Sequence, residues 1–295
     1  AGQTADITVQ VTNTTGVPAM LFTFIDWNQD GDLDDPGEVI MTQVLNGTNG
    51  TISVPVNVPA TAVLNASLGA RFRLTNAPAF SGKPTGLAAG GEVEDYYVQV
   101  QGLDFGDLTD GDTPGTYPTN TTDGGEGLGP SHIIVEGLKI GANVDAEGNG
   151  QPNAGANGDD LNGDDEDGIP MFPQITANAT ANIPVYVTNT TGGNAVLYGF
   201  IDWNADGDFD DANETVTNIV PNNAVVSILN FFVPANAVLS TNLGARFRLS
   251  TDPAAMNATG PATDGEVEDY NVQVTCPAIM TVASSAPEAC PGYQF

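Results

Sequence analysis

The sequence predicts an all-β protein made of two tandem β-sandwich domains of Ig-like or jelly-roll-like type, with calcium loops and an acidic connector. The first observation is an internal repeat, in which residues 5–13 match 181–189 and residues 91–96 match 265–270. The second is a series of short alternating segments, such as residues 7–11, separated by turn residues. The third is composition: 295 residues include 35 glycines and 20 prolines, and long helical periodicity is absent.

The repeat sets the expected domain boundaries. Residues 1–102 hold the first sandwich and residues 171–275 the second. Between them, residues 103–170 form the acidic connector, and residues 276–295 begin a further extracellular β-domain or form a tail. An apolar strand at residues 168–175 leads into the second copy and has no counterpart in the first, so we expect the first copy to be N-terminally truncated.

Each copy contains an acidic loop that resembles half of a calcium-binding loop. Residues 26–32 and 202–208 place oxygen-bearing side chains at every second position around a central glycine. Ca²⁺ takes about six to eight oxygen ligands, and glycine permits the sharp turn. The β-branched residues that follow favour a loop between two strands, with a plain acidic turn as the alternative. The expected ligands are Asp26, Asn28, Asp30, Asp32, Asp34 and Glu38, then Asp202, Asn204, Asp206, Asp208, Asp210 and Glu214, with Asp95 and Asp269 nearby.

The connector is the most acidic part of the chain, with 15 acidic residues and one lysine. We expect calcium to order it, so that it holds neighbouring modules at a fixed angle. A flexible acidic linker is the alternative. The candidate ligands are Asp145, Glu147, Asp159, Asp160, Asp164, Asp165 and Asp167.

Four of the six basic residues recur as two Arg-x-Arg pairs. Residues two apart on a strand share one face, and two glutamates with the same spacing lie on the strand expected beside them. We therefore predict cross-strand ion pairs, with an anionic ligand for the arginines as the alternative. The residues concerned are Arg71, Arg73, Glu92, Glu94, Arg246, Arg248, Glu266 and Glu268.

The net charge of −31 favours cations over nucleic acid or anionic membrane as partners. No apolar stretch is long enough for a membrane span, so we expect no membrane insertion. No catalytic motif is present and His132 is the sole histidine, so we expect no catalytic residues and a structural or hydrogen-bonding role for His132.

The cysteines and tryptophans each leave two interpretations open. Cys276 and Cys290 are expected to form a disulfide, which suits an extracellular protein, with two free thiols as the alternative. Trp27 and Trp203 lie inside the acidic loops and are expected to cap the sandwich core, with a sugar-stacking platform as the alternative.

Gly-Glu-Val-Glu-Asp-Tyr occurs twice, each time after Leu-Gly-Ala-Arg-Phe-Arg-Leu and an Asp-Trp-Asn-x-Asp-Gly-Asp loop. This combination resembles the GEVED domain family over almost all of both copies. Residues 104–107 and 164–168 are similar to the acidic lead-in that usually precedes such domains. The resemblance implies an extracellular module of large secreted or cell-surface bacterial proteins, often present in tandem, without catalytic activity.

Together these features predict a calcium-stiffened structural segment of a bacterial adhesin, stalk or fibre. Its expected partners are neighbouring modules of the same protein, with glycans, a surface ligand or further copies of the chain as alternatives. A carbohydrate-binding module, an accessory region of a secreted enzyme and a subunit of an extracellular filament remain as other functions. In the filament, a strand from a neighbour would complete the first copy.

Overall fold

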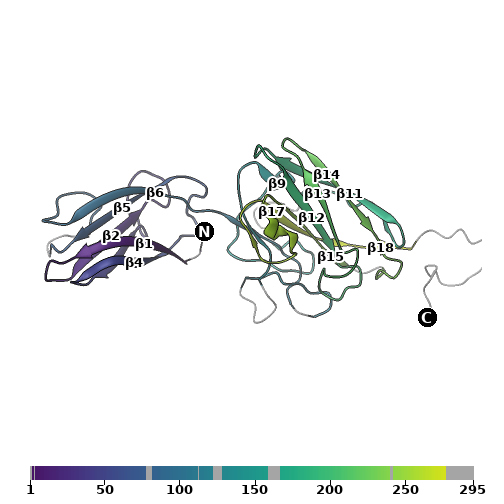
Figure 1. The fold of residues 1–295 in the computed structure, drawn as a ribbon, viewed down its shortest axis with the longest axis horizontal. Helices are drawn as coiled ribbons and strands as arrows, with labels where there is room; N and C mark the ends of the chain where they lie inside the picture. The colour runs from purple at the N-terminus through teal and green to yellow at the C-terminus, as the bar shows by residue number, and fades with distance from the viewer. Residues whose placement is uncertain are drawn as a thin grey trace, which may run out of the picture. The chain divides into compact units, whose positions relative to one another are not determined.

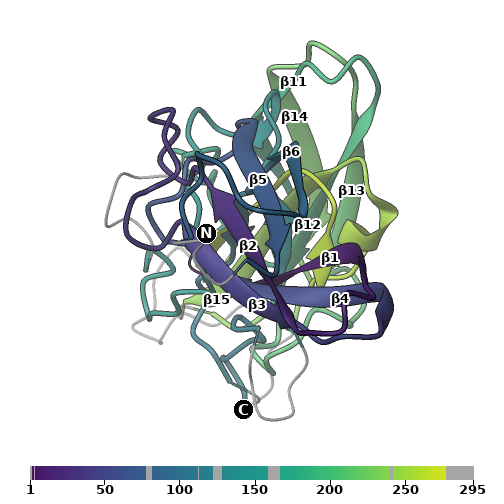
Figure 2. The ribbon, with the colours of Figure 1, turned by 90° about the vertical axis from the view of Figure 1, so that its left-hand side faces the viewer.

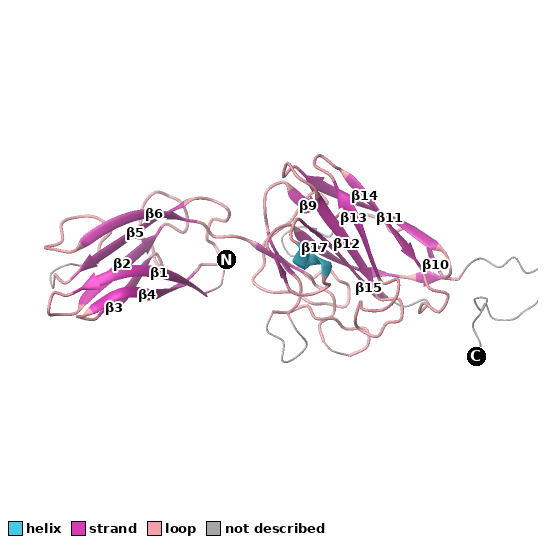
Figure 3. Cartoon of the chain, in the orientation of Figure 1, coloured by secondary structure: helices cyan, strands magenta, loops and turns pink. Residues whose placement is uncertain are grey.

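A computed structural model describes residues 2, 4–77, 82–111, 113–121, 128–158, 167–239 and 242–276. The chain divides into two compact units, residues 1–102 (unit 1) and residues 103–295 (unit 2). Strands dominate both units (Figure 3), and the described helical element is a single 3₁₀ turn, η1 (Pro253–Met256). Within the described residues, no helix has the length and apolar character needed to cross a membrane.

Unit 1 is a sandwich of two antiparallel sheets (Figure 1). One sheet pairs β1 with β4, and the other has the order β3-β2-β5-β6. The strands are β1 (Thr4–Asn13), β2 (Ala19–Ile25), β3 (Val39–Val44), β4 (Thr48–Asn57), β5 (Leu68–Thr75) and β6 (Glu92–Val98).

Alternation of apolar and polar residues builds the core of unit 1. On β4, Val54 and Val56 are buried while Ser53 and Pro55 are exposed, as expected for a strand with one face against the core. These valines pack with buried side chains of the second sheet, including Phe72. The predicted sandwich is therefore confirmed.

Unit 2 repeats this sandwich, whose strands β11 to β15 are labelled in Figure 2, and adds further strands to it. The repeated sheets are β13-β12-β15-β17 and β14-β11-β9, and further small sheets pair β16-β8-β7 and β10-β18. The strands are β7 (Leu103–Phe105), β8 (Ser131–Ile133), β9 (Leu138–Ile140), β10 (Ile175–Thr176), β11 (Thr180–Asn189), β12 (Ala195–Ile201), β13 (Thr215–Val220), β14 (Val226–Phe232), β15 (Leu243–Ser250), β16 (Pro261–Ala262), β17 (Glu266–Val272) and β18 (Val274–Thr275).

Residues 103–170, predicted as a connector between modules, belong to unit 2 and are called the lead-in segment below. Their strand β9 pairs with β11 at Val187–Asn189. Leu138 and Ile140 on β9 enter the hydrophobic core of unit 2. Burial of these two apolar side chains stabilises the packing of the segment on the second sandwich. The segment is therefore part of unit 2 and is not a separate spacer.

The C-terminal predictions lie mostly beyond the described residues, which end at Cys276. The further β-domain or tail at residues 276–295 stays a prediction. Cys290 lies outside the described residues, so its disulfide with Cys276 also stays a prediction.

Candidate metal centre

Acidic loop 1, residues 26–38, connects β2 to β3 and is fastened at both ends by buried carboxylates. Asp26 accepts hydrogen bonds from the backbone N–H groups of Asp30 and Gly31, both at 3.1 Å. Glu38 accepts from the N–H groups of Trp27 at 3.0 Å and Asp35 at 3.2 Å. The central glycine has a φ of 92°, which an L side chain rarely adopts. These two carboxylates therefore shape the loop from within.

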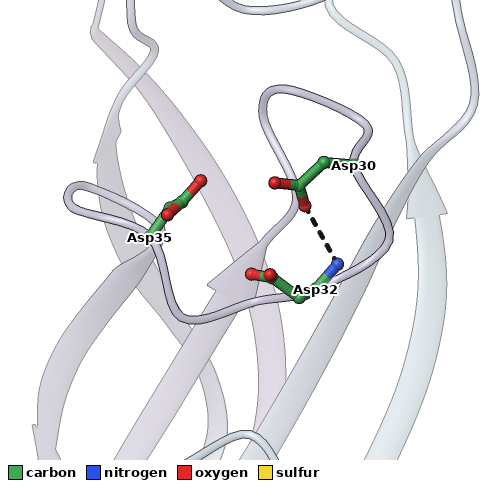
Figure 4. A group of neighbouring side chains, drawn as sticks. All are labelled: Asp30, Asp32 and Asp35. Atoms are coloured by element: carbon green, nitrogen blue, oxygen red, sulfur yellow. Dashed lines mark hydrogen bonds between the residues drawn. The ribbon is translucent and has the colours of Figure 1, made fainter.

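Three other carboxylates converge in the space that this loop encloses (Figure 4). One oxygen each of Asp30, Asp32 and Asp35 lies within 4.8 Å of the others. The amide nitrogen of Asn28 donates to Asp30 at 3.1 Å and to Asp35 at 2.7 Å. Asp30 also accepts from the N–H of Asp32 at 3.1 Å, which fixes its orientation. The result is a compact group of negative charges with an amide between two of them.

Asp34 shows how crowded these charges are. A hydrogen bond with the side chain of Asp32, together with repulsion from Asp32, Asp35 and Asp30, raises the pKa of the exposed Asp34 carboxyl. Neighbouring like charges disfavour ionisation, and a bound cation would remove that cost.

Acidic loop 2, residues 202–214, repeats the network in unit 2. Asp202 accepts from the N–H groups of Ala205 at 2.6 Å and Gly207 at 3.0 Å. Glu214 accepts from the N–H of Trp203 at 2.9 Å. As Asn28 does in loop 1, the amide nitrogen of Asn204 donates to two aspartates, Asp206 at 2.8 Å and Asp211 at 2.6 Å. The N–H of Asp211 donates to Glu214 at 3.2 Å. Two separate stretches of sequence thus build the same loop.

Loop 2 differs in being covered by the lead-in segment. The hydroxyl of Tyr117 donates to Asp202 at 2.9 Å and accepts from the N–H of Gly244 at 3.0 Å. Burial raises the pKa of Asp202, and it raises the pKa of Glu214 to about 7. Both carboxylates are harder to ionise here than in water, so a nearby cation would favour their charged forms.

The donor set suits a hard divalent cation. The converging groups are carboxylate oxygens, and Asn28 or Asn204 would add an amide oxygen after the amide turns over. Residues 26–38 and 202–214 contain no histidine or cysteine, the ligand types that zinc prefers. The acidic cluster therefore fits calcium chemistry.

The structure brings together some of the predicted ligands and not others. Asp30 and Asp32 converge with Asn28 beside them, whereas Asp34 lies outside the group of three. Asp35, which was not predicted, completes that group, and in loop 2 its counterpart Asp211 accepts from the amide of Asn204. The signal was available, since both loops contain two consecutive aspartates, at residues 34–35 and 210–211. Asp26, Glu38, Asp202 and Glu214 instead bond the backbone of their own loops, as described above.

The arginines pair with aspartates where glutamates were predicted. Arg71 binds Asp95 and Arg246 binds Asp269, each with a shortest N–O distance of 2.7 Å. The strand register explains the difference, because each arginine lies directly opposite its aspartate. Cross-strand partners share a face, and neighbouring residues on a strand point to opposite faces. The glutamates of the motif therefore lie on the other face.

The glutamates of unit 2 hold the lead-in segment. Glu268 accepts from the N–H groups of Asp167 at 3.0 Å and Gly168 at 2.9 Å, and Glu266 accepts from the N–H of Ile140. Burial raises the pKa of Glu268 to about 8. The glutamates of the Gly-Glu-Val-Glu-Asp-Tyr motif thus accept hydrogen bonds from backbone N–H groups of the lead-in segment.

Asp269 also accepts hydrogen bonds from backbone N–H groups of the lead-in segment, and it forms the ion pair with Arg246. It accepts from the N–H groups of Asp107 at 2.9 Å and Leu108 at 3.0 Å, in addition to Arg246. In the opposite direction, Asp104 of the lead-in segment accepts from the N–H of Val267 on β17 at 2.6 Å. Apart from the pair with Arg246 on β15, each of these contacts joins the motif strand β17 to the lead-in segment.

The described acidic residues of the lead-in segment also bond the protein itself. Glu147 accepts from the N–H of Phe105 at 3.1 Å, and Asp167 accepts from the N–H of Ala142 at 2.6 Å, while Asp145 is half-buried. The remaining candidate ligands of this segment lie outside the described residues, namely Asp159, Asp160, Asp164 and Asp165.

His132 is buried and neutral. Its Nδ1 lies 2.7 Å from the carbonyl oxygen of Asp264, and its Nε2 lies 2.9 Å from Nε of Arg248. Because the arginine can only donate, Nε2 must accept and Nδ1 must carry the proton. Burial and the charge of Arg248 lower the pKa of His132 to about 3. Its role in the described structure is a structural one.

Both tryptophans are buried in the sandwich cores. Their indole N–H groups donate to the carbonyl oxygens of Gly37 at 3.2 Å and Asn213 at 2.9 Å. Trp27 and Trp203 are only 5% and 2% exposed, so neither offers a face on which a sugar could stack. They cap the cores and tie the acidic loops to them.

Comparison with known proteins identifies the family. No curated protein sequence matches the chain. The solved structures of CBD12 from CALX1.2 and of the calcium binding domain CBD12 of CALX1.1 are 10% and 11% identical, with 92% of this chain and 93% of each of those chains covered. Their TM-scores of 0.22 and 0.23 are too low to support any inference about this chain. The family model of the GEVED domain matches residues 20–99 and 196–273, together more than half of the sequence. The chain belongs to the GEVED domain family, with one such domain in each unit.

Proposed function

We propose that this chain is a calcium-stabilised structural segment of a secreted or cell-surface bacterial adhesin, stalk or fibre. The observation that carries the proposal is the acidic loop built twice with most of its internal hydrogen bonds in common, and with carboxylates that converge in loop 1. The proposal includes no catalytic role.

A cation bound in these loops would stabilise the sandwich because each loop is tied to the core. Trp27 and Trp203 are buried in the cores, and their backbone and indole N–H groups bond the far ends of the loops. A cation that joins Asp30, Asp32 and Asp35 would therefore couple loop closure to the packing of the two sheets. Calcium that binds only the folded state stabilises it. The gain in the free energy of unfolding grows with the logarithm of the ratio of the calcium concentration to the dissociation constant.

The charge of the chain supports the same proposal. A net charge of −31 opposes compact folding by self-repulsion, and divalent cations relieve it. The millimolar calcium concentrations outside cells suit loops of modest affinity, as in other extracellular modules.

The alternative functions have unequal support. The carbohydrate-binding alternative relied on Trp27 and Trp203, whose burial removes the stacking platform. The filament alternative is favoured by one observation, the open positions along β6 of unit 1.

Mechanical unfolding of single molecules tests the structural role. The full chain is pulled between its ends in calcium, in magnesium and in chelator. We expect the rupture force of each unit to fall when calcium is replaced or removed. Asp35→Asn should lower the force for unit 1 alone, because its side chain accepts from Asn28 and a neutral amide weakens the cation site.

Asp6→Asn is the matched control, since Asp6 is exposed on β1 and its carboxylate accepts from Ser53. It should leave both forces unchanged. Equal rupture forces in calcium and chelator would overturn the proposal.

A further inference from the structure

In unit 2 the lead-in segment contacts both faces of the sheet along its edge strand β17, at three places. Tyr117 lies over the acidic loop, bonded to Asp202 and Gly244. His132 lies over the middle of the sheet, bonded to Arg248. Strand β9 extends the opposite sheet, and the neighbouring Gly168 donates to Glu268.

In unit 1 the corresponding positions along β6 are open. A hollow of about 420 Å³ lies where Tyr117 would sit, lined by residues that include Asp26, Gly69 and Arg71. A Cβ added at Gly244 would come within 2.3 Å of the Tyr117 ring, whereas one added at the matching Gly69 would meet nothing within 4 Å. The first hollow is therefore the empty counterpart of an occupied site.

Two further hollows continue along the same strand. One of about 250 Å³ is lined by Arg73, Glu92 and Val93. Their counterparts in unit 2 contact His132, the backbone N–H of Ile140 and the carboxylate of Asp104, respectively. The other, of about 190 Å³, lies between β1 and β6, where β9 and Gly168 lie in unit 2. These three hollows thus coincide with positions that the lead-in segment contacts in unit 2.

Most residues that line the third hollow have the same type in both units, and Gln10, whose counterpart is Tyr186, is the exception. The matching pairs are Val9 and Val185, Val11 and Val187, Leu21 and Leu197, Phe72 and Phe247, Leu74 and Leu249, Glu92 and Glu266, and Glu94 and Glu268. In each pair the residue type is the same, so the groove has the side chains that hold β9 and Gly168 in unit 2.

The exposed fractions of side chains on β6 are larger than those of their counterparts in unit 2. Val93 is 51% exposed, whereas its counterpart Val267 is 2% exposed. Tyr96 and Tyr97 on the same strand are 53% and 80% exposed. Large side chains this exposed along one strand are typical of an interaction surface.

We propose that the β6 face of unit 1, defined by β6 and the three hollows along it, is a docking surface for a second lead-in segment. That occupant is a polypeptide with the residue pattern of residues 103–170. Its apolar-polar-apolar strand would pair with β1 at Val11–Asn13, as β9 pairs with β11. Two consecutive backbone N–H groups would bond Glu94 as those of Asp167 and Gly168 bond Glu268.

The chemistry of the face favours this occupant over a second copy of unit 1. Two β6 faces packed together would bring Glu92 and Glu94 against their own copies, and like charges repel. A lead-in segment instead brings backbone donors to these acceptors and apolar side chains to the half-buried Val9 and Leu74. The inference goes beyond the structural role proposed above and does not depend on calcium.

The test fuses an extra copy of residues 103–176 directly before Ala1 of the full chain. This junction reproduces unit 2, where residue 176 precedes Ala177, the counterpart of Ala1 in the repeat. We expect amide hydrogen exchange in β1 and β6 to slow by about tenfold or more, as buried hydrogen bonds open less often. Chemical iodination of Tyr96 and Tyr97 should slow in parallel.

Three variants make the test specific. Gly168→Val in the added copy should abolish the protection, because even a Cβ there would meet Ile140 and the bound glutamate. Glu94→Leu should also reduce it, while Thr51→Leu, on an exposed position of β4, should not. Both readouts are taken in calcium and in chelator, which separates this inference from the calcium proposal.

Two results would overturn the inference. One is a fused chain in which unit 1 exchanges at the unfused rate although unit 2 remains folded. The other is an unfused chain that dimerises in ultracentrifugation and loses dimerisation in Glu94→Leu, which would make a second copy the occupant.

Discussion

Glu268→Gln tests how the Gly-Glu-Val-Glu-Asp-Tyr motif holds unit 2 together. Glu268 is 1% exposed, and burial raises its pKa from 4.5 to about 8. Between these two pH values the folded state binds a proton that the unfolded state releases. A group of this kind lowers the free energy of unfolding as pH rises through the window, and the loss is complete above the folded pKa.

The size of the effect follows from the pKa. Each pH unit is worth about 1.4 kcal/mol while only the folded state holds the proton. From pH 6.5 to pH 8, Glu268 should therefore lower the free energy of unfolding of unit 2 by about 2 kcal/mol. For a unit of this size that corresponds to a melting temperature lower by about 4–8 °C.

Glutamine mimics the protonated side chain. Its oxygen can accept from the N–H groups of Asp167 and Gly168, and its amide can donate to the hydroxyl of Tyr270, which lies 2.8 Å from Glu268. The variant should therefore be as stable as the wild type near pH 5 and more stable at pH 8.

Differential scanning calorimetry of both proteins between pH 5 and pH 8 measures the difference between their slopes. That difference isolates Glu268 from other titrating groups such as Glu214. Glu94→Gln is the matched control, because Glu94 is exposed on β6 and should leave the stability of unit 1 unchanged. Equal slopes in the wild type and Glu268→Gln would refute the reasoning.

Two further comparisons use the repeat or the glycines as internal controls. Arg246→Met should cost about 3–5 kcal/mol by leaving the carboxylate of Asp269 buried without its cation, whereas Arg71→Met in the exposed pair should cost about 0–1 kcal/mol, as denaturant titration would show. An equal cost in both units would contradict the burial difference. Gly168→Ala should cost about 1–3 kcal/mol because its Cβ would lie 2.2 Å from a carbon of Ile140, while Gly193→Ala, with nothing within 4 Å, should change the melting temperature little.

The repeated sandwich could be predicted from sequence because its signals are local. Alternating residues such as Val54 and Val56 define strands, and the second copy confirms each segment independently. The acidic loops were predicted for the same reason, since their spacing lies within one turn. Asp35 was missed because its position in the cluster depends on how the loop closes.

The ion pairs were mispredicted because strand register is not a local property. A shift of one residue moves a side chain to the other face of the sheet, and this separates Asp95 from Glu94 as the partner of Arg71. Residue spacing alone could not make that distinction.

The role of the lead-in segment could not be predicted for a different reason. Its anchoring strand, Leu138–Ile140, has three residues, and its contacts with β11 and Glu266 span large sequence separations. Short apolar runs carry little local signal, and high acidity suggested a spacer. Some of these acidic side chains instead accept backbone hydrogen bonds. Asp104 accepts from the N–H of Val267, and Asp107 accepts from the N–H of Gly158.

The central claim is that calcium binds both acidic loops and stabilises both units. Its most direct measurement is calorimetric unfolding of the wild type, Asp35→Asn and Asp211→Asn in calcium, in matched magnesium and in chelator, with the bound metal counted by equilibrium dialysis. At about 100 times the dissociation constant, calcium should stabilise each unit by about 2.7 kcal/mol. We predict that Asp35→Asn removes this gain and one ion from unit 1 only, and that Asp211→Asn does so for unit 2 only. Unchanged unfolding in chelator, with no calcium retained by the wild type, would contradict the account.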